Sequence, residues 1–553
     1  MADLNLIEHH PQRVLEAFRR GEFDQLEIIG QADEKEFFEL CFQEKILASL
    51  AQEMPTPRKK EEVPRWFVLA ANLSLKLHLE NSFLAFERVV RCGGLLSALP
   101  PEIASKHLDP QTHQILLECQ GFNDKNAYQR ATPCDQDFLR KYVKEVTSPQ
   151  WQAWFNGPVQ RVFQAHGFFD PAGIFIGDGS YLFVPDNEAY EGSVVMWFDE
   201  HNHPVNYEQL TASERKQAHR ERCYKLVSLL HLRGDAYVYA GLAVVPGNVH
   251  EDPVLYELVE NFVRHVGRGV IKQLILDRGF IDGPRIGRCK QEWGLDVLLP
   301  IKKNMDIWTD AWALAKQAHW QGWTPPVASP PTPPPRRPET IIHRERKRQK
   351  TLAAQAAQAP PPPPKETHTR TELGLLKGFT SWTECPVPLN VVLVREHYGD
   401  GHQDLWALMT TADVTDPAQP KEDYGLRATI EERHRLLKCF YDLSDFHSRS
   451  LNVITAQVVF ILLSYTLRQW QLWRLRQEAE LAGKTPGLLQ RQLNLHRQYV
   501  VIYHQHAYTQ MPLVTFTREV LELAPAARAK ALAKIRKLEQ SFLTPLENLR
   551  APP

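Results

Sequence analysis

Short apolar runs follow one another from Gly173 to about Pro300, and this texture constrains the fold more than any other feature of the sequence. The runs read GIFIGDGSYLFV, GSVVMWF, AYVYAGLAVVP and KQLILDRG. Runs of this length, rich in β-branched and aromatic residues and bounded by turn formers, are typical of strands. A helical pattern, PVLYELVENFVRHV, lies between the last two. Strands interleaved with helices predict an α/β core.

The core is flanked and interrupted by other kinds of sequence. Amphipathic helical patterns lie on both sides of it, and 553 residues are enough for two or three domains. The tracts WTPPVASPPTPPPRRPET and APPPPPK cannot sit inside a sheet, because proline donates no ladder hydrogen bond. We therefore expect a helical N-terminal region (1–165), the first part of the core (166–300), an insertion region with a flexible Pro- and Arg-rich tract (301–412), a helix that completes the core (413–445) and a helical C-terminal region (446–553).

Composition excludes several classes of protein. The formal net charge is -1, so a nucleic-acid-binding surface has to be local. The eight cysteines form no C-x-x-C pair, which argues against a zinc ribbon or a disulfide framework and favours a reducing cytoplasm. The N-terminus lacks the basic start and apolar run of a signal peptide. The apolar stretch at 453–465 is too short and too interrupted to predict a membrane span.

Two aspartates each follow an apolar strand. Asp178 comes after GIFIG and Asp277 after QLIL, and we expect each to close its strand, at the sheet edge where ligands bind. A pair of carboxylates presented in this way suits hard divalent cations such as magnesium, which prefer oxygen ligands. For either residue alone, an ordinary turn or helix cap explains the sequence about as well.

A third acid is predicted on a helix spanning residues 424–440. Tyr424, Arg427, Glu431 and Lys438 are offset by 0, 3, 7 and 14 positions and fall within roughly 60° of arc. Leu426, Ile430 and Leu437 fall on the opposite side, so the helix can bury that side in the core. Glu431 is then a third metal ligand, and the Tyr, Arg and Lys side chains would hold phosphate oxygens. The alternative is a solvated helix carrying surface salt bridges.

The spacing Tyr, two residues, Arg, three residues, Glu, six residues, Lys resembles the signature of one branch of the DDE transposases of bacterial insertion sequences. The surrounding segments GDGS, VPGNVHED, LDRGF and LLPIKKN resemble the same family. The resemblance spans about residues 174–463, apart from the Pro-rich tract. The chain departs from it at Ala428 and His434, where the family often has aromatic residues.

The resemblance implies an RNase H-like catalytic core with an insertion between Asp277 and Glu431. It implies a DNA transposase that uses Mg²⁺, with Mn²⁺ as a substitute, to cleave transposon ends and join them to target DNA. Its metal ligands would be Asp178, Asp277 and Glu431. A homodimer on DNA, a helical N-terminal region that binds transposon ends and a cytoplasmic, nucleoid-associated location are further expectations. Because Lys302 and Lys303 follow a strand near Asp277, we expect them to contact DNA as well.

Two other interpretations stay open. An RNase H-like nuclease that cleaves nucleic acid without joining strands would use the same three acids. A non-catalytic DNA-binding repressor derived from a transposase would share the fold, although it would have no physical reason to keep those acids.

Overall fold

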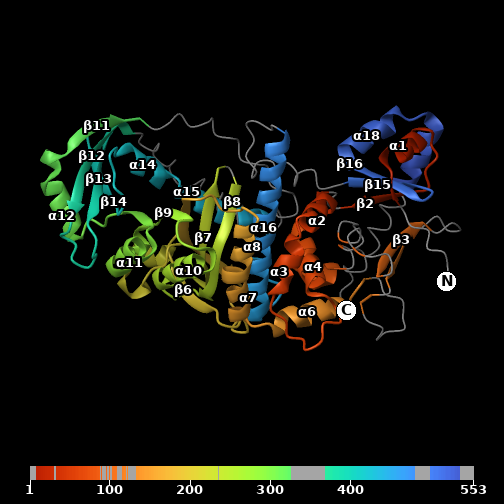
Figure 1. Cartoon of the computed structure of the whole chain (residues 1–553), viewed down its shortest axis with the longest axis horizontal. Helices are drawn as coiled ribbons and strands as arrows, with labels where there is room; N and C mark the ends of the chain where they lie inside the picture. The colour runs from red at the N-terminus through yellow and green to blue at the C-terminus, as the bar shows by residue number, and fades with distance from the viewer. Residues whose placement is uncertain are drawn as a thin grey trace. The chain divides into compact units, whose positions relative to one another are not determined.

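A computed structural model of the chain describes residues 8–29, 33–86, 89, 95, 99, 103–108, 115–119, 121–122, 132–234, 236–324, 368–479 and 499–535 (Figure 1). The chain forms two compact units built from discontinuous segments. The first unit comprises Met1–Gly173, Asp178–Val270 and Ile430–Pro553, and the second comprises Ile174–Gly177 and Ile271–Thr429. The Pro- and Arg-rich tract at 325–367 lies outside the described residues.

The first unit is built on long antiparallel strands. Strand β7 (His219–Arg233) pairs with β6 (Val194–Phe198) along its first part and with β8 (Ala236–Pro246) along the rest. Most residues of β7 and β8 are buried, because α10 (Glu251–Val266) packs on both strands and α16 (Leu451–Ala479) packs on β8. Strand β5 (Gly173–Val184) runs through both units, and its part from Asp178 onward belongs to the first.

Helix α16 is the central helix of the first unit. It packs against α2 (Asp33–Gln43), α4 (Arg65–Leu77), α6 (Gln136–Glu145) and α7 (Ser148–Trp154), and lies beside β8 in Figure 1. Helix α3 (Ile46–Gln52) packs on α4, and a π-helical turn at Phe155–Val159 joins α7 to α8 (Gln160–Ala165). Leu451–Arg474 is long and apolar enough to cross a membrane, but 89% of its most apolar window is buried within the structure. This burial is what a core helix requires.

The flanking regions are not purely helical, contrary to the prediction. Segments from both flanks form one four-stranded sheet in the order β1-β16-β15-β2, from β1 (Glu8–His9), β2 (Gln25–Ile29), β15 (Tyr499–His504) and β16 (Ala507–Pro512). Helices α1 (Pro11–Arg19) and α18 (Leu513–Glu522) complete this module, whose core includes Phe18, Phe23 and Phe516. Strand β3 (Ala104–Leu108) pairs antiparallel with β4 (Ile115–Cys119) in a separate two-stranded sheet. Helical periodicity missed these strands because they are short, and β1 and β2 find their partners far along the chain.

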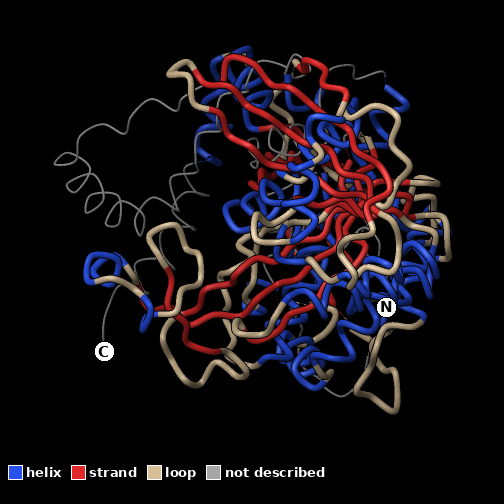
Figure 2. The backbone as a smooth tube through the Cα atoms, turned by 90° about the vertical axis from the view of Figure 1, so that its left-hand side faces the viewer, coloured by secondary structure: helices blue, strands red, loops and turns tan. Residues whose placement is uncertain are grey.

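The second unit contains one mixed sheet in the order β11-β12-β13-β14-β10-β9-β5, where β5 contributes Ile174–Gly177. Strands β9 (Ile271–Ile275) and β10 (Asp296–Pro300) are parallel. Strands β11 (His319–Trp323), β12 (His368–Phe379), β13 (Leu389–Tyr398) and β14 (Gln403–Thr410) extend β10 in antiparallel fashion, and Figure 1 shows them side by side. Figure 2 draws the strands of the chain in red. The unit also contains α11 (Gly283–Trp293), α12 (Asp306–Ala313) and α14 (Ala418–Gly425).

The predicted strand and helix texture of the core is confirmed. The runs GIFIGDGSYLFV and AYVYAGLAVVP are β5 and β8, and the helical pattern between the strands is α10. Local signals sufficed here, because each element combines strong periodicity with clear end signals. His250, for example, is the N-cap of α10, and its Nδ1 accepts a hydrogen bond from the Asp252 amide at 3.4 Å.

Lys76, on α4, is a cation that the first unit buries. Only 6% of the residue is exposed, and its Nζ donates to the Glu80 carbonyl at 3.1 Å and to Asn81 Oδ1 at 2.7 Å. Burial lowers the pKa of the amine from 10.5 to about 7, while the nearby carboxylates of Glu80 and Asp442 oppose the shift. The folded protein therefore disfavours the charged form of this side chain.

A Lys76→Met variant is expected to lose a pH dependence of stability that the wild type has. Below the folded-state pKa of about 7, both the folded and the unfolded wild type carry the proton. Above it, the unfolded state binds more protons, so wild-type stability rises with pH. Relative to Lys76→Met, the wild type should gain roughly 2 kcal/mol of unfolding free energy between about pH 7 and pH 9. Urea unfolding at several pH values measures this, and a constant difference would show that Lys76 titrates normally.

Candidate active site

Asp178 lies in the middle of a strand. We predicted that it closes the strand, but β5 continues to Val184, because SYLFV is itself a strong strand sequence. The Asp178 side chain is 15% exposed, and its Oδ2 lies 3.7 Å from Nδ1 of His434. The carboxylate therefore faces helix α15 (Ala428–Phe440), on which His434 lies.

The next residue, Gly179, lies against a second polar cluster. Successive residues of a strand point to opposite faces, and a Cβ on Gly179 would overlap the Glu251 carboxylate. Glu251 in turn pairs with Lys225 at 3.4 Å, and the Lys225 amine lies 5.0 Å from the centre of the Tyr181 ring. Burial raises the pKa of Tyr181 to about 12. The second glycine of GDGS thus makes room for a carboxylate at the N-terminus of α10, a contact that the sequence did not reveal.

Helix α15 brings its own polar residues to the same strand. The Lys438 amine donates to Ser180 Oγ at 2.8 Å, although 258 positions separate the two residues. Burial lowers the pKa of Lys438 to about 8, and the Asp178 carboxylate opposes the shift. Lys438 therefore remains mainly protonated at neutral pH. Glu431, one of the predicted metal ligands, is exposed on this helix.

His434 is a residue of this cluster that the prediction missed. It is only 3% exposed, and its Nε2 lies 2.9 Å from Ser228 Oγ on β7. Burial, reinforced by the charge of Lys438, lowers the pKa of His434 to about 3, so the imidazole is neutral. Its sequence position did hold a signal, since His434 and Lys438 are four residues apart and share a helix face.

The predicted single helix at 424–440 is wrong, because the structure divides it. Helix α14 ends at Gly425 and α15 begins at Ala428. Between them, the amides of Leu426 and Arg427 make short-range hydrogen bonds to the carbonyls of Asp423 and Tyr424. Glycine is a poor helix former, and it allows this break. Tyr424 and Arg427 therefore do not share a helix with Glu431 and Lys438, while the predicted burial of Ile430 and Leu437 is confirmed.

The second unit positions Asp277 beyond the end of β9. Its Oδ1 accepts a hydrogen bond from the Gly279 amide at 2.7 Å, so the residue caps the 3₁₀ turn Arg278–Phe280. Its Oδ2 lies 3.4 Å from Nη1 of Arg427. The carboxylate is 40% exposed. The Asp277 side chain therefore both caps this turn and lies beside Arg427, a residue of the Tyr-Arg-Glu-Lys signature.

The remaining predicted contacts also lie in the second unit. Tyr424 is half-buried on α14, with its ring 6.3 Å from that of Trp406. Lys302 and Lys303 follow β10 and are exposed, and Lys303 lies 3.5 Å from Asp404. These positions are compatible with contacts to a polyanion.

No group of three or more His, Cys, Asp or Glu side chains lies close enough to hold a metal ion, in the part of the chain that the structure describes. Asp178, Glu431 and Lys438 belong to the first unit, and Asp277, Tyr424, Arg427, Lys302 and Lys303 to the second. Within each unit, one acid lies beside a cation of the predicted Tyr-Arg-Glu-Lys segment. The three acids supply only carboxylate oxygens, which are the ligands that magnesium prefers.

Comparisons with known proteins point to one family. Residues 191–467, half of the chain, match the family described as "Transposase DDE domain". The matched range contains Asp277, Arg427, Glu431 and Lys438 and begins downstream of Asp178. No curated protein matches the chain significantly. Among solved structures, the chain is similar to the "Cryo-EM structure of piggyBac transposase synaptic complex with hairpin DNA", with a TM-score of 0.36 and 10% identity over 84% of this chain and 79% of that one.

Proposed function

The chain belongs to the DDE-domain transposase family, and from this premise we propose that it cleaves the ends of a bacterial insertion sequence and joins them to target DNA. Water attacks the phosphodiester at the transposon end, and the freed 3′ hydroxyl then attacks the target strand by in-line displacement. Asp178, Asp277 and Glu431 are the proposed catalytic acids. The enzyme would act in the cytoplasm on nucleoid DNA, as a homodimer that holds two transposon ends.

One observation carries the proposal: the Tyr-Arg-Glu-Lys segment contacts an acid-bearing motif within each unit. In the first unit, Lys438 donates to Ser180 of the GDGS motif at 2.8 Å. In the second, Arg427 lies 3.4 Å from Asp277 of the LDRGF motif. The two contacts join positions that are 258 and 150 residues apart in the sequence, so the tertiary fold brings each signature cation to an acid-bearing motif.

The element order supports an RNase H-like core. Antiparallel strands β7 and β8 follow β5, and α10 then leads to the parallel strands β9 and β10. We propose that residues 166–300 and 413–445 form this core and that residues 301–412 are its insertion. The N-terminal region at 1–165 would bind transposon ends, and the C-terminal region at 446–553 would contact DNA or a second subunit.

The proposed cofactor is Mg²⁺, for which Mn²⁺ would substitute. The Asp178 side chain is partly exposed, that of Asp277 is 40% exposed and Glu431 is exposed, so solvent reaches each of the three proposed acids. When bound, divalent cations would activate the attacking oxygen and offset charge on the scissile phosphate. Lys438, Arg427 and Tyr424 would hold phosphate oxygens, while Lys302 and Lys303 would contact the backbone farther along the DNA.

A Lys438→Gln variant is expected to lose on the order of 100-fold in cleavage rate at saturating DNA, because a preorganised cation is removed from the proposed phosphate site. Folding should be preserved, since a half-buried charge is replaced by a neutral amide. Arg435→Gln is the matched control on α15, because Arg435 is exposed and pairs only locally with Glu432 at 2.8 Å. Equal rates for the two variants would remove Lys438 from the site.

The proposed reaction is tested with labelled duplexes that carry the inverted repeats flanking the gene, incubated with Mg²⁺ and a target plasmid. Cleavage at the repeat end followed by joined products is the expected result. Cleavage without joining would favour the nuclease interpretation. Binding without cleavage would favour the repressor interpretation, and either outcome would overturn the proposal.

A further inference from the structure

The first unit has a cavity of about 360 Å³ at the start of α16, and none of the three proposed acids lines it. It lies among the 3₁₀ turn Phe83–Ala85, helix α6, the loop after α15 and the first turns of α16. Its polar lining combines hydroxyl, amide and cationic groups: Ser82, Arg140, Lys144, His447, Ser448 and Gln457. The proposed catalytic reaction uses none of these residues.

The charge balance of this cavity favours an anion. Arg140 and Lys144 are four residues apart on the exposed face of α6, so their side chains lie on the same side. Asp137 is the one acid among the described lining residues, and it already pairs with Arg140 at 3.0 Å. His447 adds a side chain that is 54% exposed, and its Nε2 lies 3.8 Å from Asp445 Oδ2. A dianionic or monoanionic oxygen group would find several donors here and little repulsion.

A neighbouring cavity also has many cationic side chains, but its charges do not favour an anion. It lies on the other side of α6, has a volume of about 560 Å³ and is also rich in cations, with Arg58, Lys59, Lys60 and Lys141. Four acids balance them, namely Glu61, Glu62, Asp135 and Asp137. Because the charges cancel, this second cavity offers no net attraction to a phosphate, and Lys141 provides a matched control on the same helix.

The anion-favouring cavity includes residues of the loop that follows α15, the helix that carries Glu431. His447 and Ser448 belong to the loop that follows α15, and Asn81 clamps that loop by donating to the carbonyls of Asp442 and Asp445 at 2.9 and 3.1 Å. Asn81 itself lines the cavity. A backbone phosphate bound here would therefore be held at a fixed position relative to the end of α15.

We infer that this cavity binds a phosphate of the DNA backbone and so positions the duplex along α15. The inference rests on the proposed function, because it assigns one contact of the DNA substrate. Phosphate contacts are independent of base sequence and are read out as salt dependence, since each one releases condensed counterions. Lys144 and Arg140 would supply the charge, and the Ser82 and Ser448 hydroxyls would complete the hydrogen bonding.

The test compares the double variant Arg140→Gln/Lys144→Gln with Lys141→Gln and the wild type, using a mixed-sequence duplex at several salt concentrations. The double variant is expected to bind about tenfold more weakly, with the slope of log affinity against log salt reduced by about 1. Lys141→Gln should bind like the wild type. The concentration of transposon-end DNA that gives half-maximal cleavage should rise by about the same factor in the double variant, because weaker phosphate contact lowers occupancy of the enzyme.

Four results would overturn the inference. Wild-type affinity in the double variant, with normal cleavage, would reject the cavity while leaving the transposase proposal intact. An equal loss of DNA affinity in Lys141→Gln would show that binding depends on the overall surface charge of α6 and not on this cavity. Thermal stabilisation of the wild type by inorganic phosphate, without any change in DNA affinity in the double variant, would assign the cavity to a free anion. A wild type that binds no DNA at all would reject the proposed function together with the inference.

Discussion

Replacing Asp178 or Asp277 by Asn, or Glu431 by Gln, is expected to abolish DNA cleavage and joining while leaving DNA binding in place. Each substitution removes one negative charge from a proposed ligand of divalent cations and keeps the shape of the side chain. Metal-assisted phosphoryl chemistry draws several kcal/mol of its rate from such ligands. A loss of about 4 kcal/mol corresponds to roughly a thousandfold in rate.

Cleavage of labelled transposon ends, monitored together with binding by gel shift, measures this effect. Glu432→Gln is the matched control, because Glu432 lies next to Glu431 on α15 and forms a local ion pair with Arg435. It should cleave at a rate close to the wild type. Near-normal cleavage by the Glu431→Gln variant, with loss in Glu432→Gln, would mean that the third acid has been assigned one residue too early.

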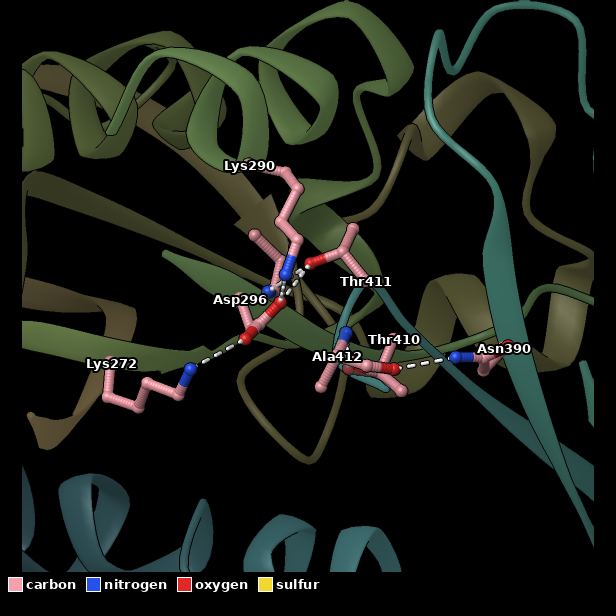
Figure 3. Close-up of polar contacts among 8 residues, drawn as sticks. Lys272, Lys290, Asp296, Asn390, Thr410, Thr411 and Ala412 are labelled. Atoms are coloured by element: carbon pink, nitrogen blue, oxygen red, sulfur yellow. Dashed lines mark hydrogen bonds and ion pairs between the residues drawn. The ribbon is translucent and has the colours of Figure 1, made fainter. Parts of the chain in front are cut away.

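A Lys272→Met/Lys290→Met double variant is expected to destabilise the second unit by about 3–5 kcal/mol. Figure 3 shows both lysines directed at the carboxylate of Asp296, at the first residue of β10. The amine of Lys290 lies 2.5 Å from one carboxylate oxygen and that of Lys272 lies 3.5 Å from the other. Asp296 is only 3% exposed, so removing both cations leaves a buried charge without compensation.

The Thr411 hydroxyl, which donates to Asp296 at 3.1 Å, would remain but cannot replace two full charges. Adding Asp296→Asn to the double variant should restore most of the lost stability, because it removes the uncompensated charge. Lys272→Met alone should cost less than about 1 kcal/mol, since that side chain is 61% exposed. Urea unfolding monitored within the second unit gives these values. A double variant no less stable than Lys272→Met would show that Asp296 does not depend on its lysines.

The extent of successful prediction follows the range of the interactions involved. Strands β5 and β8 and helix α10 were predictable, because periodicity and capping residues lie within each element. Sequence motifs predict the three acids, in contrast, but the side chains around each acid are known only from the fold. The pairing of Lys438 with Ser180 depends on tertiary packing that no local pattern encodes.

Other features escaped prediction for reasons that particular residues make clear. Seven-residue periodicity across Gly425 suggested one continuous helix, yet the poor helix propensity of glycine decides the local structure there. In the sequence, His434 is a departure from the family pattern, whereas the fold buries it between Ser228 and the strand that carries Asp178. Glu251, at the start of α10, lies against Gly179 of β5 in the first unit. No local pattern in either segment predicts this contact.

The sheet β1-β16-β15-β2 also affects how the protein emerges from the ribosome. Its strands come from residues 8–29 and 499–512, so β1 and β2 are synthesised about 470 residues before β15 and β16, their partners in the sheet. Until then, the apolar side chains of Phe18, Phe23 and Leu26 have no sheet to cover them. Exposed apolar surface of this kind recruits chaperones or promotes aggregation of the nascent chain. A message truncated before codon 499 would therefore yield a product in which β1 and β2 lack their partner strands. Translation beyond that codon supplies β15 and β16 and completes the module.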